Sequence, residues 1–321
     1  METVWSIEVL VTYFIQGMGM WLLPIMKFFS ECATEEFFIL VMPILYWCVD
    51  TAIGMRVGVV IMLSSSLVDI LKMAFRFPRP YWLFSKVHSY AQETSFGLPS
   101  GHTQKAVAVW GTMAASFKKT WLWIVSIFMI IMITVSRLYL GVHFLSDIVS
   151  GLLVGILFLV VYMKLETPVV RWAGKQSLWT IAITSLSVSL IPILVVAVIR
   201  NANAGWQIPT GWLVSNIDPF NMEGIITLNG TQFGMLFGYA WLHRKSRFEI
   251  KGTGLQLFSR YILGIAGIFA IRYGLKFIFP ETTDLFGYSL RFIRYGFIGL
   301  WVTALAPFLF IKLKLSQKAL N

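Results

Sequence analysis

The stretch SRLYLGVHFLSDIVSGLLVGILFLVVYMK occupies residues 136–164 and joins two kinds of sequence. Its second part is almost wholly apolar over a length sufficient for a helix to cross a bilayer. Its first part carries Arg137, His143 and Asp147, ionisable groups that are costly at a membrane unless they are paired or functional. The stretch therefore predicts a transmembrane helix with a polar site at its amino end.

The composition extends this interpretation to the whole chain. Of 321 residues, 57% are hydrophobic and 13% are charged, whereas soluble domains average roughly 45–50% and 25%. This balance indicates an integral membrane protein and argues against a disordered chain, a disulfide-rich secreted module or a nucleic-acid-binding protein. The two cysteines, Cys32 and Cys48, are expected to be free thiols.

Similar apolar segments recur along the chain and predict an all-α, polytopic membrane bundle of about ten helices. They lie near 5–29, 35–50, 53–75, 102–117, 120–137, 143–163, 176–199, 223–242, 256–279 and 287–311. The first segment is interrupted by polar residues, glycines and a proline, so a helix lying in the membrane interface explains it as well as a span does. Its start lacks a basic region, so a cleavable signal peptide is not expected.

The distribution of Lys and Arg predicts the orientation, because short cytoplasmic loops carry the positive excess. The net charge is +11, from 26 Lys and Arg against 15 Asp and Glu. Most cations between spans fall on one side, which we assign to the cytoplasm: Lys118, Lys119, Lys164, Arg171, Lys175, Arg244, Lys245, Arg247, Lys251, Lys312, Lys314 and Lys318. Lys72, Arg79 and Arg137 break the pattern by facing out, which suggests that chemistry requires them there.

Two further blocks reach the same outer side. One runs from Lys72 to Arg79-Pro80, and the other is Pro99-Ser100-Gly101-His102. Lys72, Arg79 and Arg137 together supply three cations and no acceptor, which suits a multiply charged oxyanion such as phosphate. Ser100 and Gly101 begin a predicted helix, whose free N–H groups and dipole point at the same anion.

The third block supplies a nucleophile. His143 and Asp147 are four residues apart and would share one face of a helix, so the carboxylate can hold one ring nitrogen while the other attacks phosphorus. His102 then acts as the general acid that protonates the leaving alkoxide, and later as the base that activates water. No cluster of His, Cys or carboxylate residues suited to a metal accompanies these groups, so no metal or cofactor is expected.

These blocks resemble the motifs of the type 2 phosphatidic acid phosphatase superfamily, whose membrane lipid phosphate phosphatases share a helical core with glucose-6-phosphatase and the vanadium haloperoxidases. The matching positions are Lys72, Arg79, Pro80, Pro99, Ser100, Gly101, His102, Ser136, Arg137, His143 and Asp147. The resemblance implies a six-helix phosphatase core over 35–165, after an N-terminal amphipathic or membrane helix at 1–34 and before an accessory four-helix region at 166–321. The neighbouring residues 46–50, 80–82 and 93–97 look similar to a bacterial branch with extra C-terminal helices, which implies a cytoplasmic membrane and a site facing the periplasm or exterior.

Several other polar residues receive a secondary role. Asp69 is expected to hold Lys72 in place or to make a purely structural contact, and Ser136 is expected to support the site from behind. Four outward cations form a candidate anion basin: Arg272, Lys276, Arg291 and Arg294. The alternative for these four is internal pairing with Glu281, Asp284, Asp218 or Glu223. The tryptophans Trp82, Trp121, Trp206 and Trp212 are typical of an interfacial belt.

The function best supported is hydrolysis of a lipid or isoprenoid phosphate ester through a phosphohistidine, at the non-cytoplasmic membrane face. The expected partners are the lipid phosphate and the bilayer, not nucleic acid, and the sequence does not indicate an oligomeric state. A lipid phosphotransferase uses the same intermediate and differs only in its acceptor. The lipid-facing bundle disfavours haloperoxidase chemistry on vanadate, and the set of His102, His143 and Asp147 disfavours a transporter that only binds phosphate groups.

Overall fold

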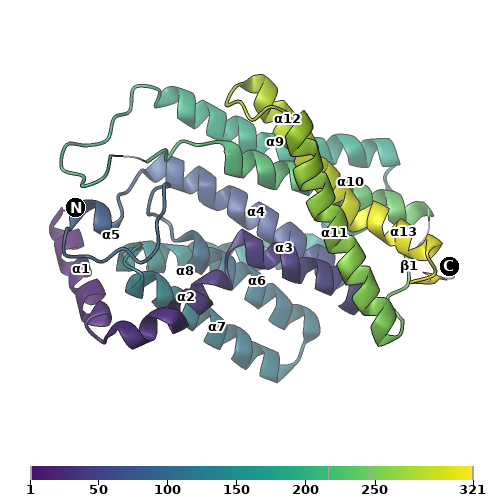
Figure 1. The fold of residues 1–321 in the computed structure, drawn as a ribbon, viewed down its shortest axis with the longest axis horizontal. Helices are drawn as coiled ribbons and strands as arrows, with labels where there is room; N and C mark the ends of the chain where they lie inside the picture. The colour runs from purple at the N-terminus through teal and green to yellow at the C-terminus, as the bar shows by residue number, and fades with distance from the viewer. Residues whose placement is uncertain (1, 216, 246, 320–321) are drawn as a thin grey trace. The chain divides into compact units, whose positions relative to one another are not determined.

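The computed structural model describes residues 2–215, 217–245 and 247–319, and almost all of its secondary structure is helical (Figure 1). The all-α, polytopic architecture expected from the sequence is confirmed, and the chain is a multi-pass membrane protein. The helices are α1 Glu2–Gln16, α2 Leu23–Glu31, α3 Glu35–Ile44, α4 Thr51–Phe75, α5 Pro80–Leu83, α6 Gly101–Phe117, α7 Thr120–Tyr139, α8 Leu145–Lys175, α9 Leu178–Ala202, α10 Glu223–Lys245, α11 Gly254–Ile278, α12 Leu285–Leu300 and α13 Ala306–Lys312.

Short irregular elements complete the chain. A 3₁₀ turn at Met20–Leu22 precedes α2, and π-helical turns at Leu45–Val49 and Trp301–Leu305 follow α3 and α12. Two short strands, β1 Arg247–Phe248 and β2 Lys318–Ala319, pair antiparallel.

The described residues contain six helical segments long and apolar enough to cross a membrane, and the bent N-terminal pair Thr3–Gln16 and Met20–Glu31 makes a seventh if it is one span. The six are Thr51–Leu83, Thr120–Tyr139, Leu145–Lys175, Leu178–Ala202, Gly254–Ile278 and Leu285–Lys312. The predicted segments near 102–117 and 223–242 form α6 and α10, which fall outside this group. Both helices have most of one face buried, with polar residues such as Gln104 and Asn229 inside, so neither needs an apolar surface all round.

The N-terminal segment is a broken helix rather than one straight rod. Thr3–Gln16 and Met20–Glu31 meet at an angle of 84° (Figure 1). The outer face of α1 exposes the large apolar side chains Val4, Ile7, Leu10 and Phe14. At its end, the Gln16 amide donates to the carbonyl oxygens of His88 at 2.7 Å and Tyr139 at 2.9 Å. The end of α1 is therefore tied to the C-terminal end of α7.

The chain divides into two compact units. The first contains the residues up to Phe38, Leu63–Met163 and Val195–Asn221. In it α2 and α6 pack on α7, and α8 approaches α6 closely because of Gly151. A Cβ at Gly151 would lie 2.7 Å from the carbonyl oxygen of Ser100, so only glycine permits this approach. The contact places the start of α8 beside the start of α6.

The second unit contains Ile39–Met62, Lys164–Leu194 and the residues from Met222 onward. Its centre is the packing of α10 on α12. A Cβ at Gly234 would lie 1.9 Å from the carbonyl oxygen of Gly296, which shows how closely the two backbones approach. Trp47 is fully buried here, and its indole donates to the carbonyl oxygen of Val302 at 2.8 Å.

Candidate active site

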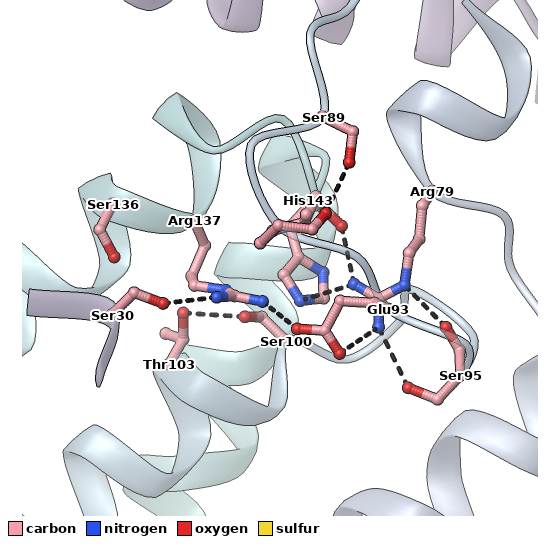
Figure 2. A network of polar contacts seen from close by, with 12 residues as sticks. Ser30, Arg79, Ser89, Glu93, Ser95, Ser100, Thr103, Ser136, Arg137 and His143 are labelled. Atoms are coloured by element: carbon pink, nitrogen blue, oxygen red, sulfur yellow. Dashed lines mark hydrogen bonds and ion pairs between the residues drawn. The ribbon is translucent and has the colours of Figure 1, made fainter. Parts of the chain in front are cut away.

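The three sequence blocks converge at one place in the first unit. Lys72 comes from the end of α4, Arg79 from the residue before α5, and Ser100 from the residue before α6. Arg137 lies in the last turn of α7 and Asp147 in the first turn of α8. Figure 2 shows Arg79, Arg137, Ser100 and His143 grouped around a common centre. Helix ends separated by up to 75 positions in the chain therefore supply one site.

His143 and Asp147 make the contact that their spacing predicts. His143 Nδ1 lies 3.1 Å from Asp147 Oδ2, and both side chains are buried. The predicted shared helix face is wrong, because α8 begins only at Leu145 and His143 lies in the turn before it. The carboxylate instead reaches back over the helix start, where it also accepts from the backbone N–H of Phe144 at 2.9 Å.

Arg79 fixes which ring nitrogen of His143 carries the proton. Its Nη1 lies 3.3 Å from His143 Nε2, and a guanidinium can only donate. Nε2 is therefore the acceptor, and the proton sits on Nδ1, where Asp147 accepts it. This is the tautomer that a nucleophilic Nε2 requires.

Arg79 itself is fully buried and held by backbone groups. Nε donates to the carbonyl oxygen of Ser95 at 2.7 Å, Nη1 to that of Val142 at 2.9 Å, and Nη2 to that of Phe96 at 3.1 Å. These bonds leave the guanidinium little freedom to rotate, so its position is set by the loop that precedes α6.

Lys72 and Arg137 are the other two cations of the site. Lys72 Nζ donates to Ser95 Oγ at 2.9 Å, and Arg79 Nη2 donates to the same hydroxyl at 3.1 Å. Arg137 Nη1 donates to Ser30 Oγ at 2.6 Å. Arg137 Nε is buried and has no hydrogen-bond partner among the described residues. A bound oxyanion would supply the missing acceptor.

The start of α6 lies against the same groups. The N–H of Ser100 donates to the carbonyl oxygen of Asp147 at 2.9 Å, and its hydroxyl accepts from Thr103 Oγ1 at 3.1 Å. Gly101 and His102 follow in the first turn, where the backbone N–H groups have no partner within the helix. His102 is partly exposed, whereas Ser100 is fully buried.

Asp69 and Ser136 are the two residues that the sequence predicts to support the site. Asp69 is partly buried and lies one helical turn before Lys72 on α4. Ser136 is fully buried, and its hydroxyl donates to the carbonyl oxygen of Ile133 at 2.6 Å within its own helix. The Ser136 hydroxyl therefore stabilises α7 and does not donate into the site.

Glu93 is the main residue that the sequence did not single out for a role. Its carboxylate forms an ion pair with Arg137 and lies 3.6 Å from Arg79 Nη2 (Figure 2). Burial by itself would raise the pKa of the Glu93 carboxyl, but the guanidinium groups of Arg79 and Arg137 lower it below its usual range. The sequence signal for Glu93 is an acidic residue in the loop between Arg79 and Ser100, close to the cations of the site.

The aromatic residues near the site pack on one another. Trp82 is fully buried, and its ring centre lies 5.1 Å from that of Trp212. Phe96 is in edge contact with Trp206 at 5.5 Å and with Phe220 at 5.4 Å. The belt interpretation is therefore wrong for the buried Trp82, whereas it stays a prediction for the half-buried Trp206 and Trp212 and for Trp121, which is 60% exposed. The connection between α9 and α10 packs against the loop that holds Arg79.

The four cations of the candidate anion basin are mostly paired. Lys276 lies 3.2 Å and Arg294 3.5 Å from Glu281, and Arg291 lies 2.6 Å from Glu223. Arg272 stands over the ring of Tyr273 at 5.9 Å. The alternatives Asp284 and Asp218 have other roles. Asp284 accepts from Gly287 N–H at the start of α12 and Asp218 from the Asn221 side chain. Pairing with Glu281 and Glu223 accounts for three of the cations without an external anion.

Comparisons with known proteins identify two matched regions. Residues 53–171 match a model of the PAP2 superfamily, and 226–318 match the PAP2 superfamily phosphatase transmembrane extension.

The part of the chain that the structure describes contains no group of three His, Cys, Asp or Glu placed to hold a metal ion.

Three curated relatives illustrate the range of similarity. A probable sphingosine-1-phosphate phosphatase of Dictyostelium discoideum is 33% identical over 40% of this chain and 35% of its own length. Glucose-6-phosphatase 2 of Homo sapiens is 24% identical over 72% and 74%. Phosphatidylglycerophosphatase B of Bacillus subtilis is 29% identical over 26% and 45%. The chain thus spans less than half of the first and third.

Among solved structures, a transmembrane PAP2-type phosphatidylglycerolphosphate phosphatase from Bacillus subtilis aligns with a TM-score of 0.46 and 21% identity. The alignment covers 52% of this chain and 88% of that one.

Proposed function

We propose that this chain, which belongs to the PAP2 superfamily of phosphatases, hydrolyses the phosphate ester of a membrane lipid through a phosphohistidine formed on His143. The observation that carries the proposal is the pair of contacts on the imidazole. Nδ1 faces Asp147, and Nε2 presents its lone pair among the site cations.

In the first step Nε2 of His143 attacks phosphorus, and the P–N bond forms as the bond from phosphorus to the ester oxygen breaks. His102 gives its proton to the departing alkoxide. Asp147 stabilises the positive imidazole that results. The negative charge on the transferring oxygens is met by Lys72, Arg79 and Arg137, and fixed donors of this kind contribute about 10²–10³ each in rate.

In the second step water attacks the phosphohistidine. His102 takes a proton from the water as the P–O bond forms and the P–N bond breaks, which releases inorganic phosphate and restores both histidines. Each step is an in-line displacement at phosphorus. Apart from the water of the second step, the groups that act in it are side chains of this protein.

The proposed substrate is a lipid because the site lies at helix ends of a multi-pass membrane protein, where a headgroup can reach it while the tail stays in the bilayer. We also propose that the site opens on the non-cytoplasmic side. The concentration of Lys and Arg in the alternate connections supports this orientation.

The test is phosphate release by purified protein in mixed micelles. Substrates should include phosphatidate, phosphatidylglycerol phosphate, a sphingoid phosphate, an isoprenoid diphosphate and glucose 6-phosphate. We expect release from at least one lipid, its loss in His143→Ala, and its retention in His243→Ala, a matched change in the second unit. Alkaline quenching should trap labelled phosphate on the wild type. Turnover by His143→Ala at the wild-type rate would refute the mechanism, and turnover of glucose 6-phosphate alone would refute the lipid substrate.

A further inference from the structure

Glu93 lies on the cations that are proposed to bind the substrate phosphate. Its two carboxylate oxygens face different arginines, Oε1 towards Arg137 Nη2 and Oε2 towards Arg79 Nη2 at 3.6 Å. Figure 2 shows the carboxylate between the two guanidinium groups. A phosphate bound to the same arginines would need the same donors, so the two anions compete for one place.

The backbone of Glu93 is fixed while its side chain spans the cations. The Tyr81 hydroxyl donates to the carbonyl oxygen of Glu93 at 2.8 Å and accepts from its N–H at 3.1 Å. One hydroxyl thus holds both backbone polar groups of Glu93. These bonds fix the backbone and not the side chain, so departure of the carboxylate from the arginines does not require the loop to move.

Burial and charge explain why an internal anion is needed. Arg79 and Arg137 are 0% and 2% exposed and Lys72 is 8% exposed, whereas the Glu93 side chain is 24% exposed. Three buried positive charges close together repel one another strongly in the absence of an anion. Asp147 lies nearby, but its Oδ2 is engaged by His143 and Phe144. Glu93 is more exposed than the two arginines that it contacts.

We propose that Glu93 occupies the phosphate position in the free enzyme, leaves when the substrate phosphate binds, and returns to expel the product phosphate. This inference rests on the proposed function for the identity of the competing anion. The carboxylate stabilises the empty site and weakens binding of both substrate and product phosphate. The carboxylate leaves Arg137 Nε without a hydrogen-bond partner among the described residues, and a bound phosphate would supply one.

Glu93→Gln keeps the size of the side chain and removes its charge, so the cations lose their internal partner. Inorganic phosphate and vanadate should then bind about 10- to 100-fold more tightly, because charge-assisted hydrogen bonds to the carboxylate no longer compete. Turnover should fall, because product phosphate leaves slowly, and KM should fall with it. Removal of a residue that only contacted the substrate would raise KM instead.

Direct binding of inorganic phosphate and of vanadate, measured by calorimetry on detergent-solubilised full-length protein, tests the inference without turnover. The matched control is Glu249→Gln, which removes a carboxylate 3.9 Å from exposed Lys251 in the second unit. Glu93→Asp shortens the side chain by one methylene, so it should give a smaller increase in the affinity for phosphate and vanadate than Glu93→Gln. It serves as the test if Glu93→Gln does not fold.

Tighter anion binding in Glu93→Gln and unchanged binding in Glu249→Gln support the inference. Equal or weaker binding in Glu93→Gln, or in Glu93→Asp where the glutamine variant does not fold, overturns it. The result is separable from the proposed function. A wild type that binds phosphate but hydrolyses no ester contradicts the function alone, and an active wild type without the gain in Glu93→Gln contradicts the Glu93 inference alone.

Discussion

Arg79 Nη1 lies 3.3 Å from Nε2 of His143, so the proposed nucleophile accepts a hydrogen bond from a cation that is also proposed to bind the substrate. The lone pair that would attack phosphorus is therefore occupied in the free enzyme. Phosphate oxygens are stronger acceptors than the imidazole and compete with Nε2 for the Arg79 donor, while the bonds to Ser95, Val142 and Phe96 keep the guanidinium in place. Binding of the phosphate group and exposure of the nucleophile are then the same event.

Asp147→Asn should leave the fold intact and lower kcat by about 10³- to 10⁴-fold, because an amide N–H facing Nδ1 favours the tautomer with its proton on Nε2. Because the same oxygen, Oδ2, faces both His143 Nδ1 and Phe144 N–H, an amide NH₂ at that place leaves the Phe144 N–H unpaired, which should cost about 1–3 kcal/mol of stability. Phosphate release measures the effect. Asp218→Asn, in the α9–α10 connection, is the matched control, and retention of more than a tenth of the activity in Asp147→Asn would contradict the role of Asp147 in fixing the tautomer.

Ser30→Ala should weaken the hold on Arg137, because the hydroxyl accepts from Nη1 at 2.6 Å and both groups are buried. Removal of the acceptor leaves a buried donor unpaired, which costs about 1–3 kcal/mol. We expect a raised KM and a lower unfolding temperature. Ser136→Ala should cost less, since that hydroxyl bonds only to its own helix. A larger effect of Ser136→Ala on KM would show that the assignment of the two serines is reversed.

Trp206→Ala should lower activity several-fold without touching the site directly. The Trp206 ring contacts Phe96, whose carbonyl oxygen accepts from Arg79 Nη2 at 3.1 Å. The loss should appear as weaker inhibition by vanadate, and Trp206→Phe should restore it because an aromatic edge contact is regained. Trp121→Ala, at an exposed position on α7, serves as control. Equal vanadate inhibition in wild type and Trp206→Ala would show that the connection does not position Arg79.

The stability difference between wild type and Glu93→Gln should depend on pH in one direction. The pKa of Glu93 is lower in the folded protein than in the unfolded chain, where it is about 4.3. The stabilisation by Glu93 is therefore fully present above the unfolded pKa and is lost as the pH falls towards the folded one. The groups that face the carboxylate are Arg79, Arg137, Lys72 and His102. Denaturation of both proteins from pH 7 to pH 3 measures this, and a difference that grows on acidification would be inconsistent with the ion pairs.

Arg294→Gln should lower stability and leave KM unchanged for every substrate. Arg294 is 4% exposed and lies 3.5 Å from Glu281, so its charge is already paired within the second unit. Without Arg294, Glu281 keeps its ion pair with Lys276. Thermal unfolding and steady-state kinetics on the same preparation separate the two effects. A raised KM with unchanged stability would instead favour an anion basin.

Local sequence predicted the parts of the site that depend on local spacing. Asp147 reaches His143 because only three residues separate them, although His143 lies before the first residue of α8. Lys72, Arg79 and Arg137 are recognisable from the sequence because they depart from the predicted charge asymmetry of membrane loops.

Apolar length and charged blocks are local properties, so the sequence alone was sufficient to predict a helical membrane protein and the residue types of the proposed oxyanion site. Which neighbours complete that site depends on the tertiary structure. Ser30 reaches Arg137 across 107 positions, and the aromatic connection at 203–221 packs on Phe96 from beyond α9. Glu93 is close in sequence to Arg79, yet its place between the two arginines depends on the fold of the loop and on the Tyr81 hydroxyl. Such contacts depend on which helix ends pack together in the folded protein, and a local sequence pattern does not predict that packing.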